Sequence, residues 1–105
     1  MDLGFFTMPV HPPHRPQFET LREDFEMTIL ADQLGFKEGF FGEHITDKAE
    51  NVTSSLIFIA WLLEQTKDII LGTGTVNIPN HHPARVAAEV AMVDHMAKGR
   101  FLFGV

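Results

Sequence analysis

Four short apolar runs recur along the chain at nearly constant spacing. They begin at Leu3, Glu38, Ile69 and Phe101, so successive runs start 31 to 35 residues apart. Helix start and stop signals lie between them, as in a repeated strand–helix unit. Such connections are right-handed and place successive strands parallel. The sequence therefore predicts an α/β fold with a parallel sheet, in which the fourth strand begins only a few residues before Val105.

The expected strands cover about residues 3–8, 38–43, 69–76 and 101–105. The first helix is expected to begin at Thr20, which forms a capping box with Glu23, and to end before Gly35 in the left-handed conformation. The apolar residues that lie roughly on one face of this helix are Leu21, Phe25, Ile29 and Leu34. The second helix follows a cap at Thr53 or Ser54 and ends near Gln65. The third begins at Pro83, ends at Gly99 and buries Val86, Val90, Val93 and Met96.

Residues 56–63 are apolar on every side of the expected second helix. Such a helix needs two covers, and we expect these to be the sheet and a subunit interface. The same run is too short to span a bilayer, which takes about 20 apolar residues.

Composition excludes several classes of protein. The net charge is −6 without a basic cluster, which argues against nucleic-acid binding. The chain has no cysteine and no recognisable signal peptide. We expect a cytoplasmic protein without membrane contact, with residues 1–105 in a single domain that has no internal boundary.

Active sites of parallel α/β folds lie at the carboxyl ends of the strands. Here those ends carry Met8, His44 and residues 75–80. His44 is the sharpest candidate, either as a general base or as a hydrogen-bond donor to a cofactor. The alternative is a histidine that only bonds its own loop. Glu43 points to the other side of the strand and is expected to be structural.

No metal site is predicted. His81 and His82 are adjacent on a loop, where two ligands rarely converge on one ion, so capping and packing beside Pro83 are favoured. His11 and His14 lie in a proline-rich loop and not on a helix face. The Gly72–Thr75 segment is glycine-rich but lacks the lysine and the following helix of a phosphate loop.

Three motifs resemble the bacterial luciferase-like family of flavin-dependent monooxygenases. They are Leu3-Gly4-Phe5-Phe6, Gly42-Glu43-His44, and a longer series from Leu71-Gly72-Thr73-Gly74-Thr75 through His82-Pro83 to Asp94-His95-Met96 and Gly99-Arg100-Phe101. The resemblance covers the whole chain in order. Its nearest branch is that of limonene and alkanal monooxygenases.

The resemblance implies a TIM (β/α)8 barrel of which this chain covers the first three strand–helix units and the start of strand four. Family members use reduced FMN, supplied by a separate flavin reductase, and dioxygen to oxygenate a small organic substrate. His44 falls on the family's catalytic histidine, although Ile45 stands where luciferases have a second histidine. Gly74 and Thr75 fall where the family often has a non-prolyl cis peptide against the flavin. Met8 and Asn77 are expected in the flavin pocket.

The resemblance also implies a homo-oligomer formed through helices two and three. A whole barrel takes about 250 residues, so the 105-residue chain alone is not expected to be a competent oxygenase. Two alternatives stay open. One is a deazaflavin (F420)-dependent oxidoreductase on the same fold, and the other is a non-catalytic, truncated flavoprotein.

Overall fold

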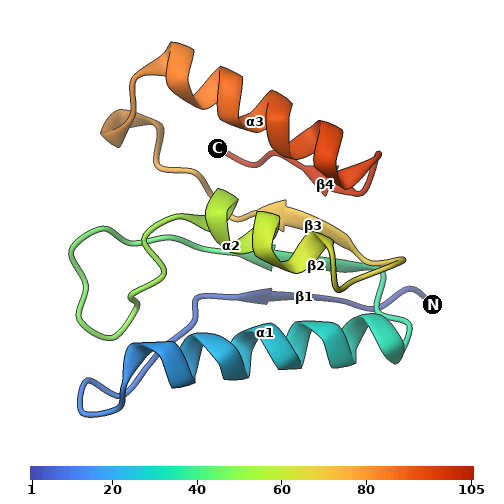
Figure 1. Ribbon diagram of the computed structural model, residues 1–105, viewed down its shortest axis with the longest axis horizontal. Helices are drawn as coiled ribbons and strands as arrows, with labels where there is room; N and C mark the ends of the chain where they lie inside the picture. The colour runs from blue at the N-terminus through green and yellow to red at the C-terminus, as the bar shows by residue number, and fades with distance from the viewer.

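The predicted alternation of strands and helices is confirmed. The computed structural model describes residues 1–105. The elements follow in the order β1 (Gly4–Thr7), α1 (Gln17–Gln33), β2 (Glu38–Phe41), α2 (Ser55–Leu63), β3 (Ile70–Thr73), the 3-10 turn η1 (Ile78–Asn80), α3 (Pro83–Ala97) and β4 (Phe101–Leu102) (Figure 1). None of the helices is both long and apolar enough to cross a membrane.

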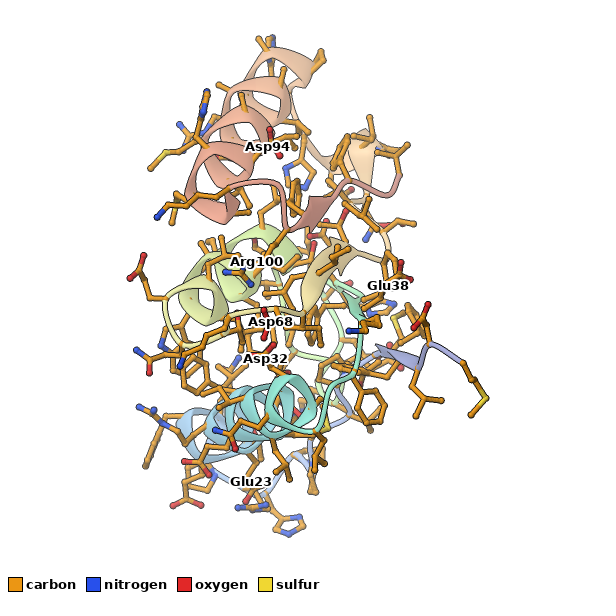
Figure 2. All side chains as sticks on the ribbon, turned by 90° about the vertical axis from the view of Figure 1, so that its right-hand side faces the viewer. Glu23, Asp32, Glu38, Asp68, Asp94 and Arg100 are labelled. Carbon is orange, nitrogen blue, oxygen red and sulfur yellow. The ribbon has the colours of Figure 1, made fainter.

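The four strands form one parallel sheet in sequence order. In this register Phe6 lies beside Phe40, Phe40 beside Gly72, and Gly72 beside Leu102. All three helices lie on the same side of the sheet (Figure 2). The sheet therefore has one covered face and one open face.

The core fills the space between the sheet and the helices. Its fully buried side chains are Phe41 and Leu71 from the strands, Ile59 and Leu62 from α2, and Ile69 just before β3. Burying one side chain of this size contributes about 1.5–3 kcal/mol to the free energy of folding. This layer therefore supplies most of the free energy that holds the helices against the sheet.

On the open face, side chains of earlier strands lie over glycines of later ones. The Phe40 ring occupies the space beside Gly72, where a Cβ would stand, and Phe6 does the same beside Gly74. Phe6 is nevertheless 60% exposed and Leu102 42% exposed. This face is consequently a flat, mostly aromatic surface.

Helix α1 begins earlier than the capping box predicts. It starts at Gln17 after Pro16, and the Thr20 hydroxyl donates to the Gln17 carbonyl inside the first turn. The predicted start at Thr20 is therefore wrong, because the proline-rich approach already sets the helical direction.

The end of α1 is as predicted at Gly35, which has φ +86°. Gly35 N–H donates to the Asp32 carbonyl and Phe36 N–H to the Ala31 carbonyl, the pair of bonds that closes a helix with a left-handed glycine. Leu34 was expected on the same face as Phe25 but is 69% exposed, because it is the cap residue after the last helical residue, Gln33.

Ser54 caps α2, with its hydroxyl accepting from Ile57 N–H at 3.3 Å. The second cover of this apolar helix comes in part from α1, since Trp61 stacks on Phe25 with ring centroids 4.0 Å apart. Trp61 is nevertheless 41% exposed, so α1 covers this side of the helix only in part and the subunit interface stays a prediction. Ile57 remains 74% exposed.

Helix α3 begins at Pro83 as predicted, and its cap is His82, whose ring accepts from Ala84 N–H. Val86 and Val93 are buried and Val90 is half-buried. Met96 was expected inward but is 38% exposed, and the fully buried Ala97 takes its place against the sheet.

The third and fourth strands are shorter than predicted. β3 ends at Thr73, whose hydroxyl donates to Gly104 O at 2.9 Å and accepts from Gly104 N–H at 2.8 Å. The Thr73 side chain thus interrupts the backbone ladder, and Val76 N–H donates to the Gly104 carbonyl again at 3.0 Å. β4 is correspondingly limited to Phe101–Leu102 and does not reach Val105.

The amino ends of the strands are joined by Asp32, at the end of α1. Its carboxylate accepts the backbone N–H groups of Lys67, Asp68 and Ile69 at 2.7 to 3.0 Å. Partial burial raises the pKa of Asp32, but these donors and the Arg100 charge outweigh it and hold the pKa below its usual value.

Arg100 completes this end from the start of β4. Its guanidinium donates to the carbonyls of Leu63, Thr66 and Ile69 and to the Thr66 hydroxyl at 3.1 to 3.2 Å. Figure 2 looks along the sheet from this end, with Asp32, Asp68 and Arg100 labelled. One fixed charge therefore satisfies the end of α2 and the turn into β3.

Candidate functional site

The strand ends bring together three of the residues singled out in the sequence. Met8 Sδ fills the space beside Gly42 where a Cβ would stand, and the Gly74 carbonyl borders the same space. These residues follow β1, β2 and β3, so the predicted gathering at the carboxyl edge is present. Met8 is half-buried there.

His44 stands just beyond β2 at this edge. Its backbone N–H donates to the Val52 carbonyl at 2.9 Å, which closes the loop that follows the strand. Its Nδ1 lies 3.0 Å from Glu50 Oε2, and the two side chains are 36% and 32% exposed.

A cavity of about 450 Å³ opens beside His44. It is lined by His44, Ile45, Thr46, Asp47, Asn77 and Asn80. A second, much smaller hollow is lined by Met8, Pro9, Gly42, His44, Glu50 and Val52. His44 thus borders both hollows.

The largest hollow lies elsewhere, on the outer surface of α1 and α2. It measures about 670 Å³ and is bordered by Phe18, Arg22 and Trp61. It contains none of the strand-end residues. The chemistry-bearing groups and the position rule for parallel sheets both favour the cavity at His44.

Glu43 is the structural centre of the edge. Its Oε2 accepts the N–H and the hydroxyl of Ser55, each at 3.0 Å, and its Oε1 accepts Asn77 N–H at 2.9 Å. His81 Nε2 lies 3.4 Å from the same oxygen. Glu43 therefore ties β2 to the start of α2 and to the loop after β3, as its expected structural role requires.

The carboxylate of Glu43 stays ionised although it is 3% exposed. Burial raises its pKa, but the donors from Asn77 and Ser55, with His81, outweigh burial and hold the pKa below the usual value. The glutamate is consequently an acceptor for backbone groups and not a proton donor.

The Gly74–Thr75 peptide bond is cis, as the resemblance predicted. Gly74 N–H donates to the Phe41 carbonyl at 2.7 Å, while Thr75 N–H and the Gly74 carbonyl make no hydrogen bond within the chain. Thr75 is exposed and Gly74 half-buried. The edge therefore presents one free donor and one free acceptor.

Asn77 lies at the rim of the larger cavity. Its amide nitrogen donates to the Glu43 carbonyl at 2.9 Å, so its position is fixed by β2. Its amide oxygen makes no bond within the chain. Only this oxygen is available to a bound molecule as an acceptor.

Sequence reasoning missed a buried cluster around His11, which is 5% exposed. Its Nε2 lies 2.5 Å from Asp24 Oδ2 and its Nδ1 2.5 Å from Asn51 Oδ1. Burial raises the pKa of Asp24 against the opposing effect of His11. The cluster joins the first loop, α1 and the loop after His44, and the sequence separation of its members left no local signal.

Glu50 was also missed as the partner of His44. A signal existed in the run Asp47-Lys48-Ala49-Glu50, because an aspartate followed by two free N–H groups often forms a turn. Asp47 Oδ1 does accept Ala49 N–H at 2.7 Å and Glu50 N–H at 2.8 Å. The structure brings together no group of three or more histidine, cysteine, aspartate or glutamate residues that could hold a metal ion.

The model of a family described as luciferase-like monooxygenase matches residues 1–105, the whole chain. The chain belongs to the luciferase-like monooxygenase family. Two curated relatives are similar over nearly all of it. A 4-hydroxyprotoasukamycin monooxygenase of Streptomyces nodosus subsp. asukaensis is 38% identical over 105 residues, and a limonene 1,2-monooxygenase of Rhodococcus erythropolis is 36% identical over 104.

A solved structure agrees with this membership of the luciferase-like family. The FMN-bound oxygenating constituent of 3,6-diketocamphane monooxygenase from Pseudomonas putida, a type II Baeyer–Villiger monooxygenase, superposes with a TM-score of 0.92 at 25% identity over 99% of the chain. The fold is therefore part of a luciferase-type (β/α)8 barrel. The chain spans 28% and 27% of the two curated relatives and 29% of the solved one.

Proposed function

We propose that this chain supplies the flavin-facing strand ends and the acid–base histidine of a monooxygenase that uses reduced FMN and dioxygen to oxygenate a small organic substrate. The observation that carries the proposal is His44, held by Glu50 at the same edge as the free Gly74–Thr75 peptide groups. Family membership supports it. The activity is that of a longer barrel, in which residues 1–105 form the N-terminal portion of a single domain.

The residues at this edge fit a flavin ring. Phe6 offers a 60% exposed aromatic ring, which lies over Gly74 as a surface for a planar ligand to stack on. Thr75 N–H and the Gly74 carbonyl match the alternating acceptors and donors of such a ring. Met8 and the Asn77 oxygen border the same area. Bound there in reduced form, FMN would supply the electrons that activate dioxygen.

Within this scheme the chain's own residues bind, orient and move a proton. Met8, Gly74, Thr75 and Asn77 bind the cofactor. His44 holds or releases a proton on its imidazole ring, which lies 3.0 Å from the Glu50 carboxylate. The reduced FMN comes from a separate flavin reductase.

A homo-oligomer through α2 and α3 forms part of the proposal. Apolar side chains remain exposed on both helices, namely Ile57 (74%) and Trp61 (41%) on α2 and Met92 (65%) and Met96 (38%) on α3. Burying such side chains against a second copy is favourable. Both helices lie on the same side of the sheet (Figure 2).

The test compares a full-length barrel that carries these 105 residues with its His44→Ala variant. FMN affinity, measured by quenching of flavin fluorescence, should change less than twofold. Turnover of limonene and of simple alkanals with reduced FMN should fall by about 100-fold or more, since acid–base catalysis contributes roughly 10²–10⁴-fold. A parallel Glu89→Gln variant, far from the strand ends in an exposed pair with Arg85, should match the wild type.

Two results would contradict the proposal. Unchanged turnover in His44→Ala would remove the catalytic assignment. Turnover that needs a deazaflavin and proceeds without dioxygen would instead favour the hydride-transferring alternative.

A further inference from the structure

His11 is the most deeply buried histidine of the chain. Its side chain is 6% exposed, whereas those of His44 and His81 are 36% and 26% exposed. Burying a polar ring costs free energy unless the ring is hydrogen-bonded. The contacts of the His11 ring therefore indicate why a histidine stands at this position.

Both ring nitrogens lie against an oxygen from another part of the chain. Nε2 lies 2.5 Å from Asp24 Oδ2 in α1, and Nδ1 lies 2.5 Å from Asn51 Oδ1 in the loop after β2. Burial raises the pKa of Asp24, so this carboxylate is also held here against the cost of losing water. A satisfied buried polar cluster fixes one arrangement of its members, which an apolar side chain of the same size would not do.

The backbone near His11 holds the same stretch of the loop. His11 N–H donates to the Ala49 carbonyl at 2.7 Å, and the Gln17 side chain donates to the Asn51 carbonyl at 3.0 Å. Residues 49–51, which contain no helix or strand, are thus attached at three places to the first loop and to the start of α1.

The other half of this loop forms part of the lining of the cavity beside the strand ends. Residues 45–47, which we call the cavity wall, are three of the six residues that line it. Asp47 Oδ1 accepts the N–H groups of Ala49 and Glu50, and these two donors hold the pKa of Asp47 below its usual value. One turn therefore connects the cavity wall to the stretch that His11 holds.

The hydrogen bond that closes the loop does not set the direction of the wall. His44 N–H donates to the Val52 carbonyl at 2.9 Å, which joins the two ends of the loop. Residues 45–51 lie between these ends without regular structure. Their direction depends on contacts outside the loop, and the contacts of His11 supply these.

We propose that His11 is the positioning residue of the cavity wall. Its ring, held by Asp24, fixes residues 49–51 and, through the Asp47 turn, keeps residues 45–47 in place. The assignment of this cavity to the small organic substrate rests on the proposed function, but the fixing of the loop does not.

The first measurement is hydrogen–deuterium exchange, read by mass spectrometry on peptides that contain residues 45–51 of a full-length barrel carrying this chain. His11→Phe keeps a ring of similar size and removes both ring contacts. Exchange should become about tenfold faster, since two lost hydrogen bonds shift an opening equilibrium by at least roughly this factor. His14→Phe, the same substitution at an exposed position of the same loop, is the matched control and should exchange like the wild type.

The second measurement separates KM from kcat with limonene and simple alkanals as substrates. In His11→Phe, KM should rise about fivefold, because the apparent affinity falls with the fraction of molecules whose cavity wall is in place. We expect kcat and FMN affinity to change less than about twofold, since neither His44 nor a residue assigned to the cofactor belongs to the His11 cluster. Partial unfolding would instead lower the apparent kcat and leave KM unchanged.

Asn51→Leu tests the same contact from the side of the loop and covers the case in which His11→Phe does not fold. It removes the side chain that meets His11 Nδ1 and leaves the pair of His11 with Asp24. Exchange of residues 45–51 should again be faster than in the wild type. The double variant should exchange no faster than His11→Phe alone, because both substitutions remove one shared contact.

Unchanged exchange of residues 45–51 in both His11→Phe and Asn51→Leu would overturn the proposal. Faster exchange with an unchanged KM in an active barrel would overturn it as well. Faster exchange in His11→Phe, in a barrel whose wild type oxygenates no substrate, would reject the proposed function and leave the positioning of the loop by His11 in place.

Discussion

The two ends of the sheet are each held by a carboxylate that accepts backbone N–H groups, but they are completed by different partners. At the amino end, Asp32 is joined by Arg100, whose guanidinium donates hydrogen bonds to four acceptors. At the carboxyl end, Glu43 is joined by neutral donors and by His81 at 3.4 Å. A fixed charge completes one end, whereas titratable and partly free groups complete the other.

The difference separates stability from chemistry. Arg100 donates to the carbonyls of Leu63, Thr66 and Ile69 around the α2–β3 turn, and a guanidinium stays charged at any ordinary pH. The carboxyl end keeps the Thr75 N–H, the Asn77 oxygen and the ring of His44 available. This division agrees with the placement of active sites on the carboxyl side of parallel barrels.

The largest effect should come from removing the fixed charge. Arg100→Ala deletes all donors to Leu63, Thr66 and Ile69, and we expect the free energy of unfolding to fall by roughly 3 kcal/mol, because charged hydrogen bonds contribute about 1.5–3 kcal/mol each and partly overlap. Urea unfolding measures it. Arg85→Ala, in an exposed pair, is the control and should cost less than about 1 kcal/mol. Equal effects would refute the distinction.

A smaller effect is expected at the other end. Glu43→Gln places the NH2 group of an amide, which cannot accept a hydrogen bond, against the donors of Ser55 or Asn77. The free energy of unfolding should fall by about 2 kcal/mol, the cost of one unsatisfied buried group. Glu64→Gln, exposed at the end of α2, serves as the control and should be neutral. A loss of less than about 0.5 kcal/mol, which is close to the error of such measurements, would mean that Glu43 does not hold the carboxyl edge together.

The smallest effect is the pH dependence of that same glutamate. The pKa of Glu43 is below its unfolded value, so its contribution is complete above the unfolded pKa and is lost as the pH falls through the folded pKa. Unfolding in urea from pH 7 downward should therefore show a smaller loss of stability in Glu43→Gln than in the wild type. Parallel pH profiles would show that another carboxylate, such as Asp32, dominates the acid response.

Sequence patterns predicted what depends on local chemistry and on the period of the repeat. The strand order, the left-handed Gly35 and the start at Pro83 all follow from such signals. The patterns failed where tertiary packing decides. Met96 was placed inward by helical spacing, but Ala97 is the fully buried residue there, and Leu34 is exposed at the cap of α1.

The candidate site was only partly predictable. Strand-end positions selected His44, Met8, Gly74, Thr75 and Asn77, whose functional roles stay predictions. What the sequence did not indicate was the pair of long-range contacts that shape the site. His11 meets Asp24 and Asn51 across 13 and 40 positions of the chain, and such distances leave no periodic trace.

The glycines of the open face have a consequence for how this sequence can vary. Phe40 stands in the space beside Gly72, and Phe6 in the space beside Gly74, so each aromatic ring depends on a missing side chain on another strand. Alanine at position 72 would displace the Phe40 ring, and a small residue at position 40 would leave a void over the glycine. Two positions more than 30 residues apart are therefore expected to change as a pair among homologues or not at all.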